Sequence, residues 1–149
     1  MIADATGSQK KTIQDFLNGG VRTLLDVGCG TGEKTSFIAG YAGYTVGIDP
    51  EAGAVRMAQA CHGSRHLCFQ VARAESLCFA GAAFDAAVFN ESLHHVPVGL
   101  QKMALNESGR ILKSGGRMLI IEPIHGSGAL GQKMRLYRDE KAQAQNAID

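Results

Sequence analysis

The sequence predicts an α/β domain built on a doubly wound parallel sheet of about five strands, with helices on both faces. Apolar, β-branched runs recur along the chain, and segments with helical spacing of apolar residues separate them. The strand-like runs are apolar throughout rather than alternating, which is typical of strands buried on both faces of a parallel sheet. Right-handed crossovers between such strands place the intervening helices on both sides.

The expected elements begin with a helix and then alternate between strand and helix. The first helix, over residues 8–17, has Ile13, Phe16 and Leu17 at helical spacing and ends at a glycine pair. The other helices are expected over residues 33–41, 51–61 and 98–112, and the strands over residues 21–27, 44–48, 66–72, 84–89 and 117–121.

We expect a single domain over residues 1–149, with a core at 21–123 and a C-terminal tail at 124–149. Leu130, Met134 and Tyr137 form a short apolar stripe in the polar tail, which favours a helix. No C-terminal strand pair is expected after the fifth strand, so the fifth strand would have an unpaired edge. A homodimer that covers this edge, a minimal open site, or a chain that is a fragment would each account for it.

Composition and charge argue against several classes of protein. The 15 basic and 14 acidic residues nearly cancel, whereas nucleic-acid binders usually carry a basic excess. No apolar run is long enough to span a membrane, and the N-terminus lacks the features of a secretory signal. The cysteines contain no CxxC pair and suit reduced thiols, so a cytoplasmic location is expected. Cys61, His62, His66 and Cys68 match no standard zinc spacing, and no metal is expected.

The strongest functional signal is a glycine-rich turn after the first expected strand. Asp26 precedes Gly28, Gly30 and Gly32, and glycines let a ligand approach the main chain at the start of a helix. Asp49 lies 21 residues after Gly28, at the end of the second strand, where an acidic side chain can accept the hydroxyls of a nucleotide ribose. In the alternative interpretation the glycines only allow close packing of helix on sheet, a role that suits Gly32.

The turn differs from the dinucleotide-binding fingerprint G-x-G-x-x-G, because it reads G-x-G-x-G and follows Asp26. An acidic side chain at this point would repel a pyrophosphate but suits a cationic group. The predicted ligand is therefore an adenosine-like molecule with a positive centre and no phosphate, which disfavours a nicotinamide-dependent oxidoreductase.

With these residues the sequence resembles the class I S-adenosylmethionine-dependent methyltransferases, particularly the group called methyltransferase type 11. The matching motifs occur in order at Leu25–Gly32, Gly47–Pro50, Ala74–Leu77, Phe84–Val88 and Leu112–Arg117. The resemblance implies a Rossmann-like fold, S-adenosylmethionine as cofactor with S-adenosylhomocysteine as product, and methyl transfer to a small-molecule acceptor. The alternative is a non-catalytic S-adenosylmethionine-binding module with a regulatory or structural role.

The resemblance also implies roles for matching positions around the cofactor. Asp26 would hold the methionine amino group, directly or through water, while Gly28 and Gly30 expose backbone to the methionine part. Asp49 would take the ribose hydroxyls, and Pro50 would pack beside the adenine.

Further implied contacts come from the third and fourth strands. Ala74 and Glu75 would edge the adenine, and Asn90 would face the methionine end and the reaction site. Arg73 departs from the family pattern, because many relatives have an aspartate there, so a carboxylate contact to the adenine amino group is lost.

Two histidines follow Asn90 in a segment that also resembles the family. A histidine near the acceptor can act as a general base for an O–H or N–H nucleophile, which makes His95 and His94 the candidate catalytic residues. In the alternative interpretation one caps a turn and the other packs against the sheet, and methyl transfer relies on alignment and exclusion of water. Glu122, after the fifth strand, would either line the pocket or be a solvated strand-end acid.

Overall fold

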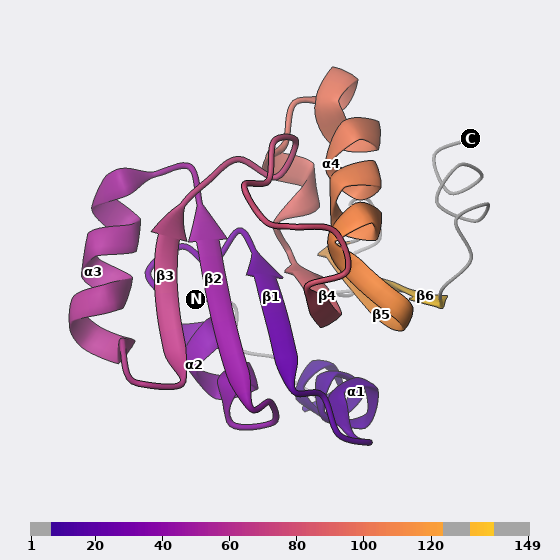
Figure 1. Ribbon diagram of the computed structural model, residues 1–149, viewed down its shortest axis with the longest axis horizontal. Coiled ribbons are helices and arrows are strands. Elements are labelled where there is room, and N and C mark those ends of the chain that lie inside the picture. Colours follow the sequence, from indigo (N-terminus) through magenta and orange to yellow (C-terminus); the bar gives the residue numbers. More distant parts are fainter. Residues whose placement is uncertain (1–6, 124–131, 139–149) are drawn as a thin grey trace.

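The computed structural model describes residues 7–123 and 132–138, and its centre is a six-stranded sheet of order β3-β2-β1-β4-β5-β6 (Figure 1). The strands are β1 (Thr23–Val27), β2 (Tyr44–Asp49), β3 (Leu67–Val71), β4 (Phe84–Asn90), β5 (Leu112–Pro123) and β6 (Gln132–Arg138). The helices are α1 (Ser8–Leu17), α2 (Glu33–Ala39), α3 (Ala52–His62) and α4 (Val98–Ile111), with a short 3-10 helix, η1, at Leu93–His95. Strands β1 to β5 are parallel, which confirms the predicted fold class.

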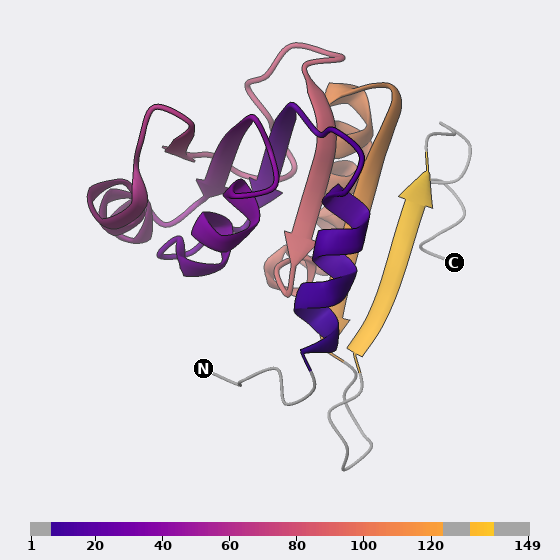
Figure 2. The same ribbon diagram turned by 90° about the horizontal axis from the view of Figure 1, so that it is seen from below.

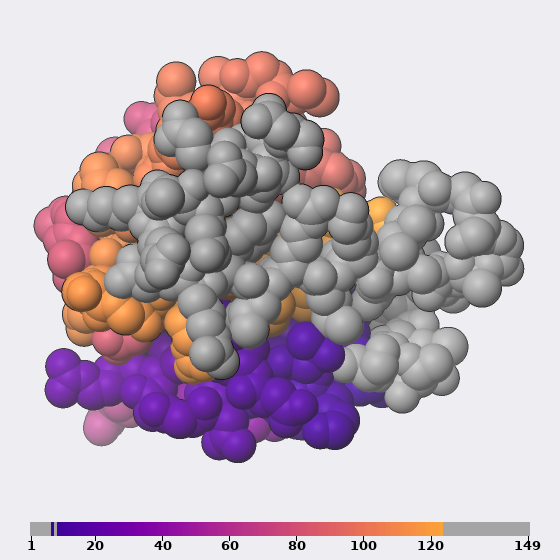
Figure 3. Space-filling view, turned by 90° about the vertical axis from the view of Figure 1, so that its right-hand side faces the viewer, coloured from indigo at the N-terminus to yellow at the C-terminus, as the bar shows by residue number. Residues whose placement is uncertain are grey.

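Helices cover both faces of the sheet because adjacent residues of a strand point to opposite sides. Leu24 of β1 packs in one cluster with α1 and with Ile38 of α2, whereas Leu25 packs in another with Leu105 of α4. Figure 2 shows α1 beside β4 and β5, with β6 at the outer edge of the sheet. In the space-filling view of Figure 3 the indigo residues of the early part of the chain form the lower side of the molecule, and the salmon and orange residues lie above them.

Strand β5 begins earlier than expected, at Leu112, directly after α4. Phe84 pairs with Leu112, but Ala86 pairs with Arg117. The glycine-containing stretch of β5 between Leu112 and Arg117 therefore bulges from the ladder. Gly115 has a φ of 78°, which glycine adopts without strain.

The C-terminal tail contains a strand where the sequence predicts a helix, and this part of the prediction is wrong. Strand β6 runs antiparallel to β5, with Arg138 opposite Arg117 and Gln132 opposite Pro123. The pairing gives partners to the backbone N–H and C=O groups along the outer edge of β5, which a helix would leave unpaired. The expected unpaired edge of β5 is therefore wrong as well, and with it the reason for a homodimer that covers this edge. Leu130 and the rest of the expected tail lie outside the described residues.

Candidate cofactor and catalytic site

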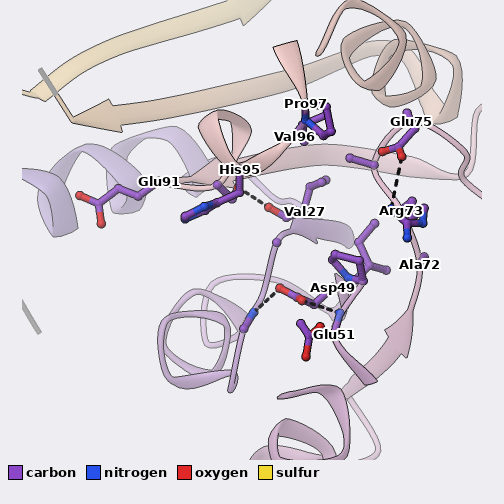
Figure 4. Close-up of a pocket in the computed structure, with 16 residues that line it drawn as sticks. Val27, Asp49, Glu51, Ala72, Arg73, Glu75, Glu91, His95, Val96 and Pro97 are labelled. Atoms are coloured by element: carbon purple, nitrogen blue, oxygen red, sulfur yellow. Dashed lines mark hydrogen bonds and ion pairs between the residues drawn. The ribbon is translucent and has the colours of Figure 1, made fainter. Parts of the chain in front are cut away.

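A cavity of about 430 Å³ opens where β1, β2 and β4 end, the edge at which ligands bind in open parallel sheets (Figure 4). Its volume lies in the range of small-molecule sites. The residues predicted from the sequence that line it are Gly28, Gly30, Asp49, Pro50, Ala74, Glu75 and His95. The cavity lining does not include Asp26, Gly32, Asn90 and His94.

The glycine turn forms the wall of the cavity nearest β1. The N–H groups of Gly28 and Cys29 both donate to the carbonyl of Ile48, at 2.8 Å, and so join the turn to the end of β2. Gly28 has a φ of 85°, and a Cβ at this position would overlap the side chain of Ser92. Glycine is therefore required at position 28 by both backbone conformation and space.

Gly32 has a packing role in the structure. It precedes α2 with a φ of 91°, and a Cβ there would lie 2.9 Å from both the Ala58 side chain and the Phe69 ring. This geometry matches the alternative interpretation of close helix packing rather than contact with a ligand.

Asp49 joins the glycine turn to the start of α3 at the wall of the cavity. Its Oδ2 accepts a hydrogen bond from the Gly30 N–H at 3.0 Å, and its Oδ1 accepts one from the Glu51 N–H at 2.9 Å (Figure 4). A carboxylate offers about four acceptor positions, so two remain for a ligand. Asp49 is thus a fixed acceptor with capacity for two hydroxyl donors.

Asp26 is buried behind the turn rather than exposed in the cavity. Its Oδ2 accepts a hydrogen bond from the Thr35 hydroxyl at 2.6 Å, while its Oδ1 has no partner among the described residues. Burial raises the pKa of Asp26 to about 6, although the Thr35 hydrogen bond and the charge of Lys34 act in the opposite direction. A buried carboxyl oxygen without a partner is costly, and a cationic group or a bridging water beside it would remove that cost.

The cavity also has apolar walls, and charged residues stand at its rim. Ile48, Pro50 and Ala74 supply the apolar surface, which suits a flat aromatic ring. Arg73 and Glu75 lie 3.9 Å apart as an ion pair, with the arginine side chain 70% exposed and the glutamate 13% exposed. Arg73, which the sequence marks as a departure, therefore stands at the cavity mouth.

The segment after β4 supplies wall residues that the sequence does not single out. Ser92 donates from its hydroxyl to the Val27 carbonyl at 2.5 Å and so ties this segment to β1. Glu91 has a φ of 56° and forms an ion pair with Lys34 at 2.6 Å. Glu91 and Ser92 lie in the segment that resembles the family, but the sequence assigned them no role, because their place on the wall depends on the pairing of β1 with β4.

Asn90 and His94 make other contacts. The Asn90 side-chain oxygen accepts a hydrogen bond from Gln9 of α1 at 2.7 Å, so this amide connects β4 to the N-terminal helix. His94 lies 2.5 Å from Glu122, Nδ1 to Oε2, and Glu122 also accepts the Leu93 N–H at 2.8 Å. Glu122 is therefore a partner of η1, and His95 is the histidine of η1 that reaches the cavity.

Within residues 7–123 and 132–138, no group of three or more His, Cys, Asp or Glu side chains is placed to hold a metal ion. In the same described residues, no helix has the length and apolar character needed to cross a membrane.

The parallel sheet of order β3-β2-β1-β4-β5 is the fold of class I S-adenosylmethionine-dependent methyltransferases, and comparison with known proteins identifies the family. A family model described as a methyltransferase domain matches residues 25–120, so the chain belongs to this family. The O-methyltransferase resE of Aspergillus sclerotiorum is 38% identical over 104 residues, which is 66% of this chain and 39% of resE. The ubiquinone/menaquinone biosynthesis C-methyltransferase UbiE of a Geobacter species is 34% identical over 114 residues, 71% of this chain and 47% of UbiE.

Solved structures share the fold. The [4+2]-cyclase SpnF superimposes with a TM-score of 0.71 at 30% identity, over 83% of this chain and 47% of SpnF. Geranyl diphosphate C-methyltransferase of Streptomyces coelicolor, solved with S-adenosylhomocysteine, gives a TM-score of 0.67 at 24% identity, over 78% of this chain and 44% of that enzyme. The chain thus spans less than half the length of each of these four proteins.

Proposed function

We propose that this chain binds S-adenosylmethionine in the cavity and transfers its methyl group to a hydroxyl group of a small molecule. The observation that carries the proposal is the meeting of the glycine turn with Asp49 at the cavity wall. The backbone of the glycine turn is open to a ligand, and the fixed Asp49 carboxylate has two remaining acceptor positions. Together these features suit a ribose that carries a charged substituent.

Each part of the cofactor has a candidate partner. Asp49 accepts the two ribose hydroxyls, and the apolar surface of Ile48, Pro50 and Ala74 contacts the adenine. The unpartnered Oδ1 of Asp26 takes the methionine ammonium, directly or through water. The chemistry supplied by the bound cofactor is an electrophilic methyl group on a sulfonium, which the lone pair of the acceptor attacks as the C–S bond breaks. The chain's own residues align the two reactants and exclude water, which supplies much of the rate of such a transfer.

Two observations support a hydroxyl acceptor. Relatives such as resE are O-methyltransferases by name, and the His95 ring stands at the cavity wall, where it can accept the proton that a hydroxyl loses. Val96 and Pro97 beside His95 make this end of the cavity apolar, which suits an uncharged organic acceptor.

A second candidate function is one without methyl transfer. SpnF, 30% identical to this chain, is named for a [4+2] cyclisation, so a protein of this fold is known by a different reaction. The alternative raised by the sequence, a non-catalytic cofactor-binding module with a regulatory or structural role, likewise involves no methyl transfer.

Two measurements test the proposal. Titration calorimetry with S-adenosylhomocysteine should show binding at micromolar concentrations, and its absence at high micromolar concentrations would refute the proposed cofactor. A screen for consumption of S-adenosylmethionine across phenols, alcohols, carboxylates, amines and thiols should then find turnover with a hydroxyl compound. Binding without turnover of any compound would favour the module.

A further inference from the structure

Glu122, at the end of β5, holds η1 with both oxygens of its carboxylate. Oε1 accepts the Leu93 N–H at 2.8 Å, and Oε2 lies 2.5 Å from Nδ1 of His94. The Glu122 side chain is 22% exposed, and an ionised carboxylate can only accept hydrogen bonds. The proton in the contact with His94 therefore belongs to Nδ1, which fixes the tautomer of that ring.

The His94 ring in turn lies against His95. The two ring centroids are 4.0 Å apart with an interplanar angle of 42°, and His95 lines the cavity. Helix α4 secures the same segment, because the Gln101 amide donates to the carbonyls of Leu93 at 3.3 Å and Val96 at 3.1 Å. A 3-10 helix of three residues has little stability of its own, so these contacts decide where the His95 ring stands.

We infer that Glu122 and His94 are positioning residues that hold the His95 ring at the cavity wall, where His95 accepts the proton of a phenolic acceptor. The inference rests on the proposed function and names its acceptor class. Val96 and Pro97, the apolar lining residues that follow His95, suit the ring of a phenol better than a charged acceptor.

The proposed step balances in atoms and charge. The proton moves from the phenol oxygen to a ring nitrogen of His95 and then to water. The oxygen bonds to the methyl carbon with its own electron pair, and the electron pair of the broken C–S bond stays on sulfur, so the sulfonium becomes a neutral thioether. No further reactant is needed.

The contacts of η1 matter because rate depends steeply on alignment. A misplacement of about 1 Å in a reacting group can cost about 100-fold in rate. Neither Glu122 nor His94 lies on the cavity wall, so each acts through His95.

The first test needs neither cofactor nor acceptor. Long-range 1H–15N NMR of the cofactor-free protein should show His94 almost entirely in the Nδ1–H form. The variant Glu122→Gln keeps the size of the side chain but removes its charge, and should move His94 toward a mixture of tautomers. His66, which precedes the edge strand β3 and is far from β5 in the strand order, should keep its signals. A wild-type His94 with its proton on Nε2 would overturn the inference.

The second test compares two phenols of different acidity, 4-nitrophenol and 4-methoxyphenol. His95→Gln should lower methylation of 4-methoxyphenol by about 10²–10⁴-fold, the range for loss of a general base, but lower that of the more acidic 4-nitrophenol much less. His94→Gln and Glu122→Gln should each lower kcat by up to about 100-fold, the cost of a misplacement of about 1 Å in a reacting group. The double variant should be no slower than the slower single variant, because the two residues act as one unit.

The outcomes separate this inference from the proposed function. S-adenosylhomocysteine should bind the wild type and the four variants within about twofold of one another, and failure of the wild type to bind it would refute the proposed function itself. Binding without methylation of either phenol would refute the acceptor class. Equal losses of activity toward the two phenols in His95→Gln would refute the role of His95 as a base. Full activity in Glu122→Gln, with His94 in a mixture of tautomers, would refute the role of the positioning pair.

Discussion

The carboxyl group of Asp26 should make the stability of the cofactor-free protein depend on pH between about 4 and 6. Burial raises its pKa to about 6, whereas an unfolded chain has an aspartate pKa of about 3.9. Each pKa difference of 1 corresponds to about 1.36 kcal/mol, so ionisation of Asp26 in the folded state costs about 3 kcal/mol. Because the folded state binds the proton more tightly, the free energy of unfolding falls as pH rises through this window and is level above it.

The variant Asp26→Asn removes the titrating group and keeps a similar shape. Urea unfolding followed by circular dichroism at several pH values from 4 to 7.5 gives the free energy of unfolding of both proteins. The difference between them should change by about 3 kcal/mol across the window in favour of the variant, since contributions of other groups cancel. Parallel profiles for the two proteins would refute the assignment of a raised pKa to Asp26.

Asp26 should also release a proton when the cofactor binds. An ammonium group next to Oδ1 would favour the ionised form, so binding of S-adenosylhomocysteine at pH 6 should release about half a proton, since half of Asp26 is protonated there. Calorimetry in buffers of different ionisation enthalpy measures this number. In Asp26→Asn the release should vanish, and an unchanged release would show that it comes from another group.

Three further predictions concern the cofactor turn and the opposite end of the strands, where β4 begins. Asp49→Asn should weaken S-adenosylhomocysteine binding by about 2–3 kcal/mol through loss of charge-assisted hydrogen bonds. As a control, Asp15→Asn on the exposed face of α1 should leave the affinity within twofold of the wild type. Equal affinities of Asp49→Asn and the wild type would mean that the ribose is held elsewhere. Gly28→Ala should destabilise the fold by about 1–3 kcal/mol and reduce binding, because the added Cβ overlaps Ser92 at a φ of 85°; thermal unfolding checks the first effect and calorimetry the second. Asp85→Asn should cost about 2 kcal/mol of stability at pH 7 and little near pH 2. Hydrogen bonds from Thr23, Lys113 and Arg22 outweigh burial and lower the pKa of Asp85 to about 2, so its contribution to stability is lost as pH falls from about 4 to 2. Urea unfolding at both pH values checks this, and a destabilisation that persists at pH 2 would contradict the cause.

The C-terminal strand shows where local pattern is insufficient. Met134 and Leu136 alternate with Lys133 and Arg135, a period-two signal for a strand, but Leu130, Met134 and Tyr137 equally fit a helix. The hydrogen-bonding edge of β5 decides between them, and it belongs to a segment distant in sequence.

The residues around the cavity divide in the same way. Gly28, Gly30 and Asp49 could be proposed from sequence because a turn between strand and helix needs particular residue types at particular spacings, and those needs are local. Glu91 and Ser92 lie in a segment that resembles the family, but their contacts with Lys34 and Val27 could not be proposed, since these depend on the neighbouring position of β1 and β4.

The parallel α/β fold, the family and the position of the glycine turn could be derived from the sequence, because periodicity and turn chemistry depend on neighbours along the chain. The packed structure was needed to show that Asp26 is buried with an oxygen that has no partner among the described residues, that Gly32 packs against Ala58 and Phe69, and that Glu122 contacts His94. These properties depend on burial and on contacts between residues as far apart in sequence as Gly32 and Phe69, so they depend on how the whole chain packs.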